Sequence, residues 1–231
     1  MSIKRPQLAN DEIYHLVLRG VADSDIFKSP DDYWRAIFSL YEFNTTKPIE
    51  IRIQREKRKQ TKNGGQSSDE RDLIVDILAF CFMPNHIHLL VRQKIENGIT
   101  QFMRKLGTGY AYYFNKKHNR KGHLFQGRFC AVHIQSDRQL KTVFVYIHTN
   151  PISLIDFEWK EEGTKDTQKA MEFLEDYKWS SFLDYIGSQN FPSITEREFL
   201  TDVFRGKKKC KEIVFDWIKG KRLYFRDVEL E

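Results

Sequence analysis

Two apolar runs joined by a short turn constrain what this chain can fold into more than any other feature. The stretches "LIVDILAFCF" (73–82) and "HIHLLV" (86–91) have the composition and length of buried strands. Only the tripeptide Met-Pro-Asn separates them, so they can pair only as antiparallel neighbours. The sequence therefore predicts an antiparallel hairpin at the centre of the core, with His86 and His88 built into it.

Further strands and helices follow from hydrophobic periodicity and end signals. Strands are expected at 12–20, at 49–55, where isoleucines alternate, and at 129–135; helices are expected from 30 onwards, at 97–118 and at 137–151. Two glycines in the second of these helices, Gly107 and Gly109, indicate the close approach of another backbone. With helices on one face of the sheet, this order predicts an α+β sandwich around an antiparallel sheet.

The C-terminal part of the chain and one internal stretch are expected to stand apart from this sandwich. Residues 1–152 form the expected main domain, interrupted by a flexible insertion at about 44–72 that shows no clear periodicity in its second half. Residues 153–231 form an acidic helical extension and a basic tail. No apolar run approaches the length of a membrane span, and three widely spaced cysteines are typical of a reducing cytoplasm.

Charge is distributed unevenly along the chain. Residues 92–138 contain ten lysines and arginines but only two acids, whereas residues 153–202 contain twelve acids and five bases. A basic middle segment indicates a polyanionic partner, most simply nucleic acid. A solvated charged surface explains the same pattern equally well.

The two histidines of the hairpin are spaced for a common task. Side chains alternate along a strand, so His86 and His88 project from the same face and could together hold a metal ion. The alternative explanation, two half-exposed surface histidines, has more weight for this spacing alone. Tyr146 and Asn150 lie one turn apart on a flank of the last predicted helix, and at the helix end the amide oxygen of Asn150 could reach outward as a metal ligand. A tyrosine at the edge of the core above an asparagine that caps the helix explains the same spacing equally well.

Three separated motifs taken together give the chain a resemblance to a known family. "FMPNHIHLLV", "GHLFQGRF" and "YIHTNP" occur in the order found in the single-tyrosine HUH transposases, and most closely resemble the REP-associated tyrosine transposases. "YHLVLRG" and "WSSFLDYIG" support the resemblance, which covers roughly residues 12–187. It implies a ferredoxin-like βαββαβα sandwich as the catalytic domain of residues 1–152, to which the helical extension of residues 153–231 is added.

The resemblance also implies roles for individual residues. His86 and His88 match the metal-binding histidines of the motif, Tyr146 matches the nucleophile, and Asn150 takes the place of the third ligand. The implied activity is Mg²⁺- or Mn²⁺-dependent cleavage and strand transfer of single-stranded DNA through a 5′-phosphotyrosine. The implied substrate carries a hairpin, the implied location is cytoplasmic and nucleoid-associated, and a homodimer is left open.

Residues of the basic segment suit such a substrate. Phosphate contacts are expected from the basic side chains, and stacking on bases from aromatic ones, including Tyr112 and Phe129. The predicted DNA-binding residues are Lys116, Lys117, Arg120, Lys121, Phe125 and Arg128. Two alternatives remain: a replication initiator or relaxase with the same chemistry, and a hairpin-binding protein without activity.

Overall fold

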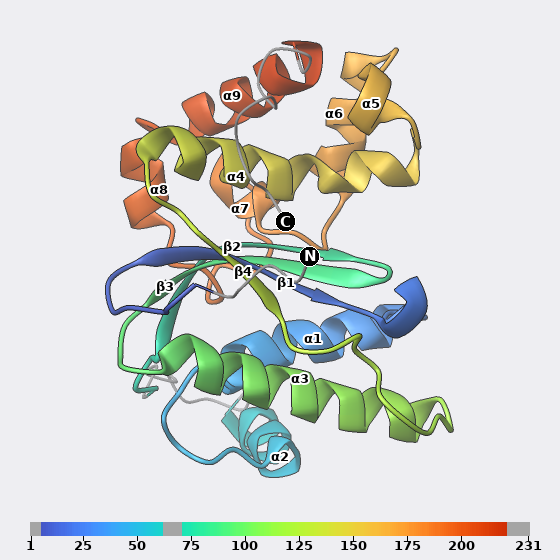
Figure 1. Ribbon diagram of the computed structural model, residues 1–231, viewed down its shortest axis with the longest axis vertical. Helices are drawn as coiled ribbons and strands as arrows, with labels where there is room; N and C mark the ends of the chain where they lie inside the picture. Colours follow the sequence, from blue (N-terminus) through green and yellow to red (C-terminus); the bar gives the residue numbers. More distant parts are fainter. Residues whose placement is uncertain (1–5, 62–70, 221–231) are drawn as a thin grey trace.

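A four-stranded antiparallel sheet forms the centre of the molecule. The computed structural model describes residues 6–61 and 71–220 (Figure 1). The strands are β1 (Ile13–Arg19), β2 (Val75–Met83), β3 (His86–Gln93) and β4 (Cys130–His133), in the order β2-β3-β1-β4. Met83 pairs with His86 at the turn, so the predicted hairpin is confirmed.

Helices cover both faces of this sheet. Helices α1 (Pro30–Glu42) and α3 (Gly98–Lys117) pack against one face, and α4 (Asp137–Thr149) packs against the other (Figure 1). The order of elements is the predicted βαββαβα, with one additional helix. The expectation of helices on one face was wrong, because both faces of the sheet are apolar and each is buried in its own hydrophobic cluster.

Local signals define the ends of the main helices. Ser29 caps α1 in a capping box with Asp32, and Pro30 is the first helical residue, as its fixed φ favours. Ser136 caps α4 by accepting a hydrogen bond from the backbone N–H of Gln139. Both ends agree with the sequence prediction.

The predicted strand at 49–55 is a helix instead. Helix α2 (Ile51–Thr61) occupies most of it, in the first half of the predicted insertion. Arginine, glutamine, glutamate and lysine have high helix propensity, and Arg52 pairs with Glu56 one turn later at 3.3 Å. These local preferences outweigh three alternating isoleucines. Residues 62–70 of the predicted insertion lie outside the described residues.

Gly109 does allow a close approach, although to a side chain. A Cβ atom built there would lie 2.6 Å from Cζ of Phe43, whereas one at Gly107 would meet nothing nearer than 3.9 Å. The predicted approach of a backbone was therefore wrong at both positions. Gly109 instead makes room for the Phe43 ring between α1 and α3.

The C-terminal part continues the same core over α4. Its helices share a hydrophobic cluster with α4 and β2, and residues 179–181 hydrogen-bond to the free edge of β2. The elements are η2 (Asn150–Leu154), α5 (Trp159–Glu162), α6 (Thr167–Asp176), α7 (Phe182–Ile186), α8 (Glu198–Val203) and α9 (Lys207–Gly220). Within the described residues, no helix has the length and apolar character needed to cross a membrane.

Candidate active site

The side chains of His86 and His88 on β3 project from the face of the sheet that α4 covers. Ile87, between them, is part of the cluster on the opposite face, as the alternation of side chains requires. His86 and His88 are both buried, with exposed fractions of 7% and 0%, and their rings are 4.6 Å apart. They are therefore not the half-exposed surface histidines of the alternative explanation.

Helix α4 brings Tyr146 and Asn150 to the same place. The Tyr146 ring lies edge-on to His88 at 5.6 Å between centroids. Asn150 follows the last residue of α4, and its Nδ2 lies 3.1 Å from Nε2 of His88. The structure thus brings together the four residues singled out as nucleophile and metal ligands, two from a strand and two from a helix.

The side chain of Asn150 is buried, and only one of its two polar atoms has a hydrogen-bond partner. Its Oδ1 has no hydrogen-bond partner among the described residues, although the side chain is only 1% exposed. The expectation that this amide reaches outward was wrong, because Asn150 is enclosed at the point where α4 runs directly into η2. Rotating the amide by a half-turn would present the oxygen beside His88 instead.

These donors fit a divalent metal ion. With the amide rotated in this way, one amide oxygen and two imidazoles would form a set that is compatible with Mg²⁺ or Mn²⁺ and also with softer ions. Across the residues that the structure describes, no three histidine, cysteine, aspartate or glutamate side chains form a metal-binding cluster.

A third histidine, absent from the prediction, completes the group. His15 on β1 is 1% exposed, and its Nε2 lies 3.0 Å from Nδ1 of His88. Alternation along β1 puts His15 on the face opposite Tyr14 and Leu16. That alternation was visible in the sequence, but the contact with His88 depends on how β1 and β3 align.

Positive charge and burial control the protonation of the central histidine. Burial, and then the nearby His86 and His15, hold the pKa of His88 well below its ordinary value. His88 is therefore neutral near pH 7, the form that binds metal ions. Lys160 of α5, which sequence reasoning also missed, lies with its Nζ 5.5 Å from the Tyr146 ring centroid.

The predicted DNA-binding residues divide into two groups. Lys116 and Lys117 lie at the end of α3, and Lys117 is held by Asp32 at 2.9 Å. The others lie in the loop of residues 118–129. There Lys121 and Arg128 are exposed, Arg120 contacts Asn115 at 3.2 Å, and Phe125 packs against the core. Phe129 is buried, so it does not offer its ring to a base.

The loop of residues 118–129 lies beside the histidine pair of β3. Backbone hydrogen bonds of 2.9 Å join Val21 to Leu124 and Gln126 to Arg19 at the end of β1. Gly20 in turn donates to the carbonyl of Asn85, the residue before His86, at 2.8 Å. Exposed cations of the loop are therefore anchored at the end of the sheet where the histidine pair begins.

Comparison with known protein families finds one match for this fold and site. Residues 53–150 match the family model described as Transposase IS200 like. The matched region includes His86, His88, Tyr146 and Asn150, but ends before the C-terminal helices. No curated protein matches the chain in sequence.

A similar solved structure is that of a REP-associated tyrosine transposase bound to a REP hairpin. It is 16% identical to this chain, with a TM-score of 0.49, and the match covers 86% of this chain and 96% of that one.

Proposed function

We propose that the protein is a single-tyrosine transposase that cuts and rejoins single-stranded DNA, with Tyr146 as nucleophile and His86, His88 and Asn150 as ligands of Mg²⁺ or Mn²⁺. The convergence of Asn150 with His88 beside Tyr146 carries this proposal. A histidine pair, a phenol and an amide from two distant segments have no structural need to share one buried site. The substrate class, a strand with a hairpin, is the one that the sequence motifs imply.

The chain's own residues provide orientation and charge for the reaction. A bound divalent ion supplies Lewis-acid stabilisation of the negative charge that builds on the scissile phosphate. Lys160 adds a positive charge beside Tyr146, where it can attract the same phosphate. The contact with His15 fixes the ring of His88 in one orientation.

The reaction is a transfer of one phosphodiester bond. Oη of Tyr146 bonds to phosphorus, the bond from phosphorus to the 3′ oxygen breaks, and the phenolic proton ends on the released 3′-OH. The 5′-phosphotyrosine retains the energy of the bond, so a different 3′-OH can attack it and join strands without ATP. Such a reversible step suits transposition.

Removal of the phenolic oxygen tests the assignment directly. Tyr146→Phe retains the ring and should fold normally, yet should form no covalent adduct with a cleavable single strand in Mn²⁺. The matched control, Tyr41→Phe, removes the same atom from α1, on the other face of the sheet, and should form the adduct at the wild-type rate. A denaturing gel with label on the 5′-phosphate side of the cut reports the adduct.

An adduct that persists in Tyr146→Phe would overturn the nucleophile assignment. Wild-type protein that binds the hairpin but never cuts it would support the alternative of a hairpin-binding protein without activity.

A further inference from the structure

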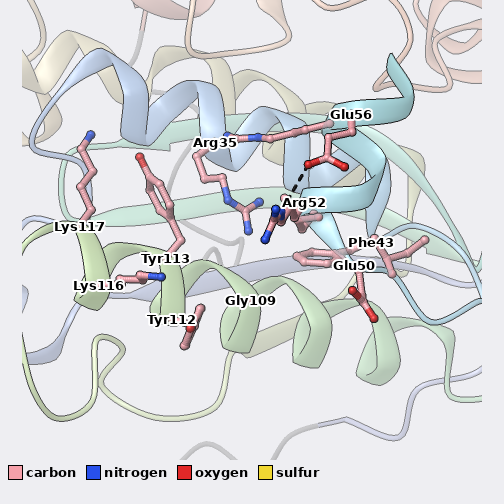
Figure 2. A pocket seen from close by; sticks show the side chains of 13 residues that line it. Arg35, Phe43, Glu50, Arg52, Glu56, Gly109, Tyr112, Tyr113, Lys116 and Lys117 are labelled. Carbon is pink, nitrogen blue, oxygen red and sulfur yellow. Dashed lines mark hydrogen bonds and ion pairs between the residues drawn. The ribbon is translucent and has the colours of Figure 1, made fainter. Parts of the chain in front are cut away.

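A groove of about 750 Å³ lies between α1, α2 and α3 (Figure 2). These helices lie on the side of the sheet opposite α4 (Figure 1), the helix that contains Tyr146. Five of the side chains that line it are basic and two are acidic. Its size is within the range of about 300–1,000 Å³ that ligand sites usually have. One wall is formed by α2, the helix that stands where the sequence predicted a strand.

Part of the positive charge in the groove is not neutralised by the protein. Lys117 is paired with Asp32 at 2.9 Å, and Arg52 with Glu56 at 3.3 Å. Arg55 and Lys116, which are both exposed, make no ion pair with any described residue. The groove therefore has a surplus of positive charge that can neutralise an anion.

A buried guanidinium at the groove strengthens this reading. Arg35 is only 5% exposed; it donates a hydrogen bond to Ser39 and lies 5.3 Å from the Tyr113 ring centroid, but no carboxylate of the described residues pairs with it. Burial, and then the nearby Arg55, lower the pKa of Arg35 to about 10, so it remains charged at neutral pH. A buried charge without a counter-ion costs free energy. An anionic ligand would offset that cost.

An exposed aromatic ring stands at the same groove. Tyr112 is 71% exposed, and it lies one turn from Lys116 on the same side of α3 (Figure 2). Exposed aromatic rings next to cations are the usual means of holding unpaired bases and their phosphates. Duplex DNA offers no free base face to such a ring.

We propose that this groove binds a single-stranded segment of nucleic acid, with phosphates near Arg55 and Lys116 and a base stacked on Tyr112. The inference rests on the proposed function in one respect only, that the protein handles single strands. Because the groove lies away from Tyr146, its occupant is a different stretch of DNA from the one that is cut. The groove would hold a flanking strand while the other face carries out the reaction.

Binding of an unstructured strand tests the groove separately from catalysis. Fluorescence anisotropy with a labelled oligothymidine in EDTA measures affinity as a function of salt, with no cleavage to interfere. The double variant Arg55→Gln/Lys116→Gln should lower the salt slope by about 1.4, that is about 0.7 for each lost phosphate contact. The matched control, Lys169→Gln/Lys208→Gln, removes two exposed charges from the helices on the opposite side and should leave the slope unchanged.

Tyr112→Ala distinguishes a single-strand site from a merely basic surface. The loss of one stacked base should weaken binding of the oligothymidine by about five- to 150-fold and leave binding of a duplex of equal length unchanged. The proposal would be overturned if both double variants lowered the salt slope equally. It would also be overturned if Tyr112→Ala left the affinity for oligothymidine unchanged. A failure of Tyr146 to form its adduct would leave these measurements unaffected, so the two proposals fail separately.

Discussion

His15 and His88 share a hydrogen bond between ring nitrogens of neighbouring strands, Nε2 to Nδ1, at 3.0 Å. On the other side of the His88 ring, Nδ2 of Asn150 donates to Nε2 at 3.1 Å. A neutral His88 that accepts at Nε2 carries its proton on Nδ1 and donates it to His15. The bond to His15 therefore selects the form of His88 whose Nε2 lone pair is directed to the candidate metal site.

The first prediction concerns this selection. His15→Ala removes the acceptor and should weaken Mn²⁺ binding by about 10- to 100-fold, the usual effect of losing such a partner. His15→Gln retains a side-chain acceptor and should recover part of the affinity. Mn²⁺ titration by calorimetry, with no DNA present, measures both variants. A Kd for Mn²⁺ that is the same in His15→Ala and wild type would show that His15 has no part in orienting His88.

The second prediction separates metal binding from DNA binding. His86→Ala or His88→Ala should abolish cleavage of a hairpin substrate in Mg²⁺ yet leave its affinity largely unchanged, because phosphate contacts supply most of the binding free energy. A gel-shift measurement and a cleavage assay on the same labelled hairpin give the two quantities. Cleavage at the wild-type rate in either variant would contradict the metal-site assignment.

The third prediction uses two glycines of α3 that are two residues apart. Gly109→Ala forces the new Cβ against the Phe43 ring, 2.6 Å from Cζ, and should lower the free energy of unfolding by about 1–3 kcal/mol. Gly107→Ala meets only ordinary contacts and should raise it by up to about 1 kcal/mol through helix propensity. Urea unfolding of both variants measures the two effects. Equal changes in the free energy of unfolding of the two variants would show that contact with the Phe43 ring does not destabilise Gly109→Ala.

The fourth prediction concerns acid stability. Burial alone would raise the pKa of Asp32, but hydrogen bonds from Lys117, the Lys28 backbone and His118 outweigh it and lower the pKa below 3.8. A carboxyl whose pKa is lower in the folded state stabilises the fold above pH 3.8, and this stabilisation is lost as the pH falls through the folded pKa. Wild-type protein should therefore lose stability steeply in that range.

Asp32→Asn should remove this contribution. The variant should be about 1–3 kcal/mol less stable at pH 7, because Lys117 loses its buried partner, and the difference from wild type should shrink as the pH falls below 3.8. Urea unfolding at a series of pH values measures the difference. A gap that stays constant down to the lowest pH would mean that Asp32 does not titrate with unfolding.

Local patterns predicted most of the architecture, and together with the family resemblance they predicted four residues of the candidate site. Strand alternation put His86 and His88 on one face, and helix spacing stacked Tyr146 over Asn150; both are short-range rules that tertiary structure left intact. Helix α2 was missed because three alternating isoleucines resemble a strand, although their neighbours favour a helix. A strand also needs a free sheet edge, and sequence periodicity does not show whether one is available.

Two neighbours of the site could not be predicted for a different reason. His15 meets His88 only because Val17 pairs with His88 and thereby fixes the alignment of β1 and β3. Lys160 approaches Tyr146 only because the chain turns back after α4 through η2. Both contacts depend on how separate strands and helices are placed in space, which neither periodicity nor spacing encodes.

Helix α4 lies between the sheet and a second layer of helices, with the Phe144 ring 4.4 Å from that of Phe204 and His148 hydrogen-bonded to Ser181 at 2.8 Å. If Tyr146 is the nucleophile, its helix cannot swing out or be exchanged with another copy without opening this core. In that case the rearrangement that turns cutting into joining is a movement of the nucleic acid, whose free 3′ ends change places over a stationary tyrosine.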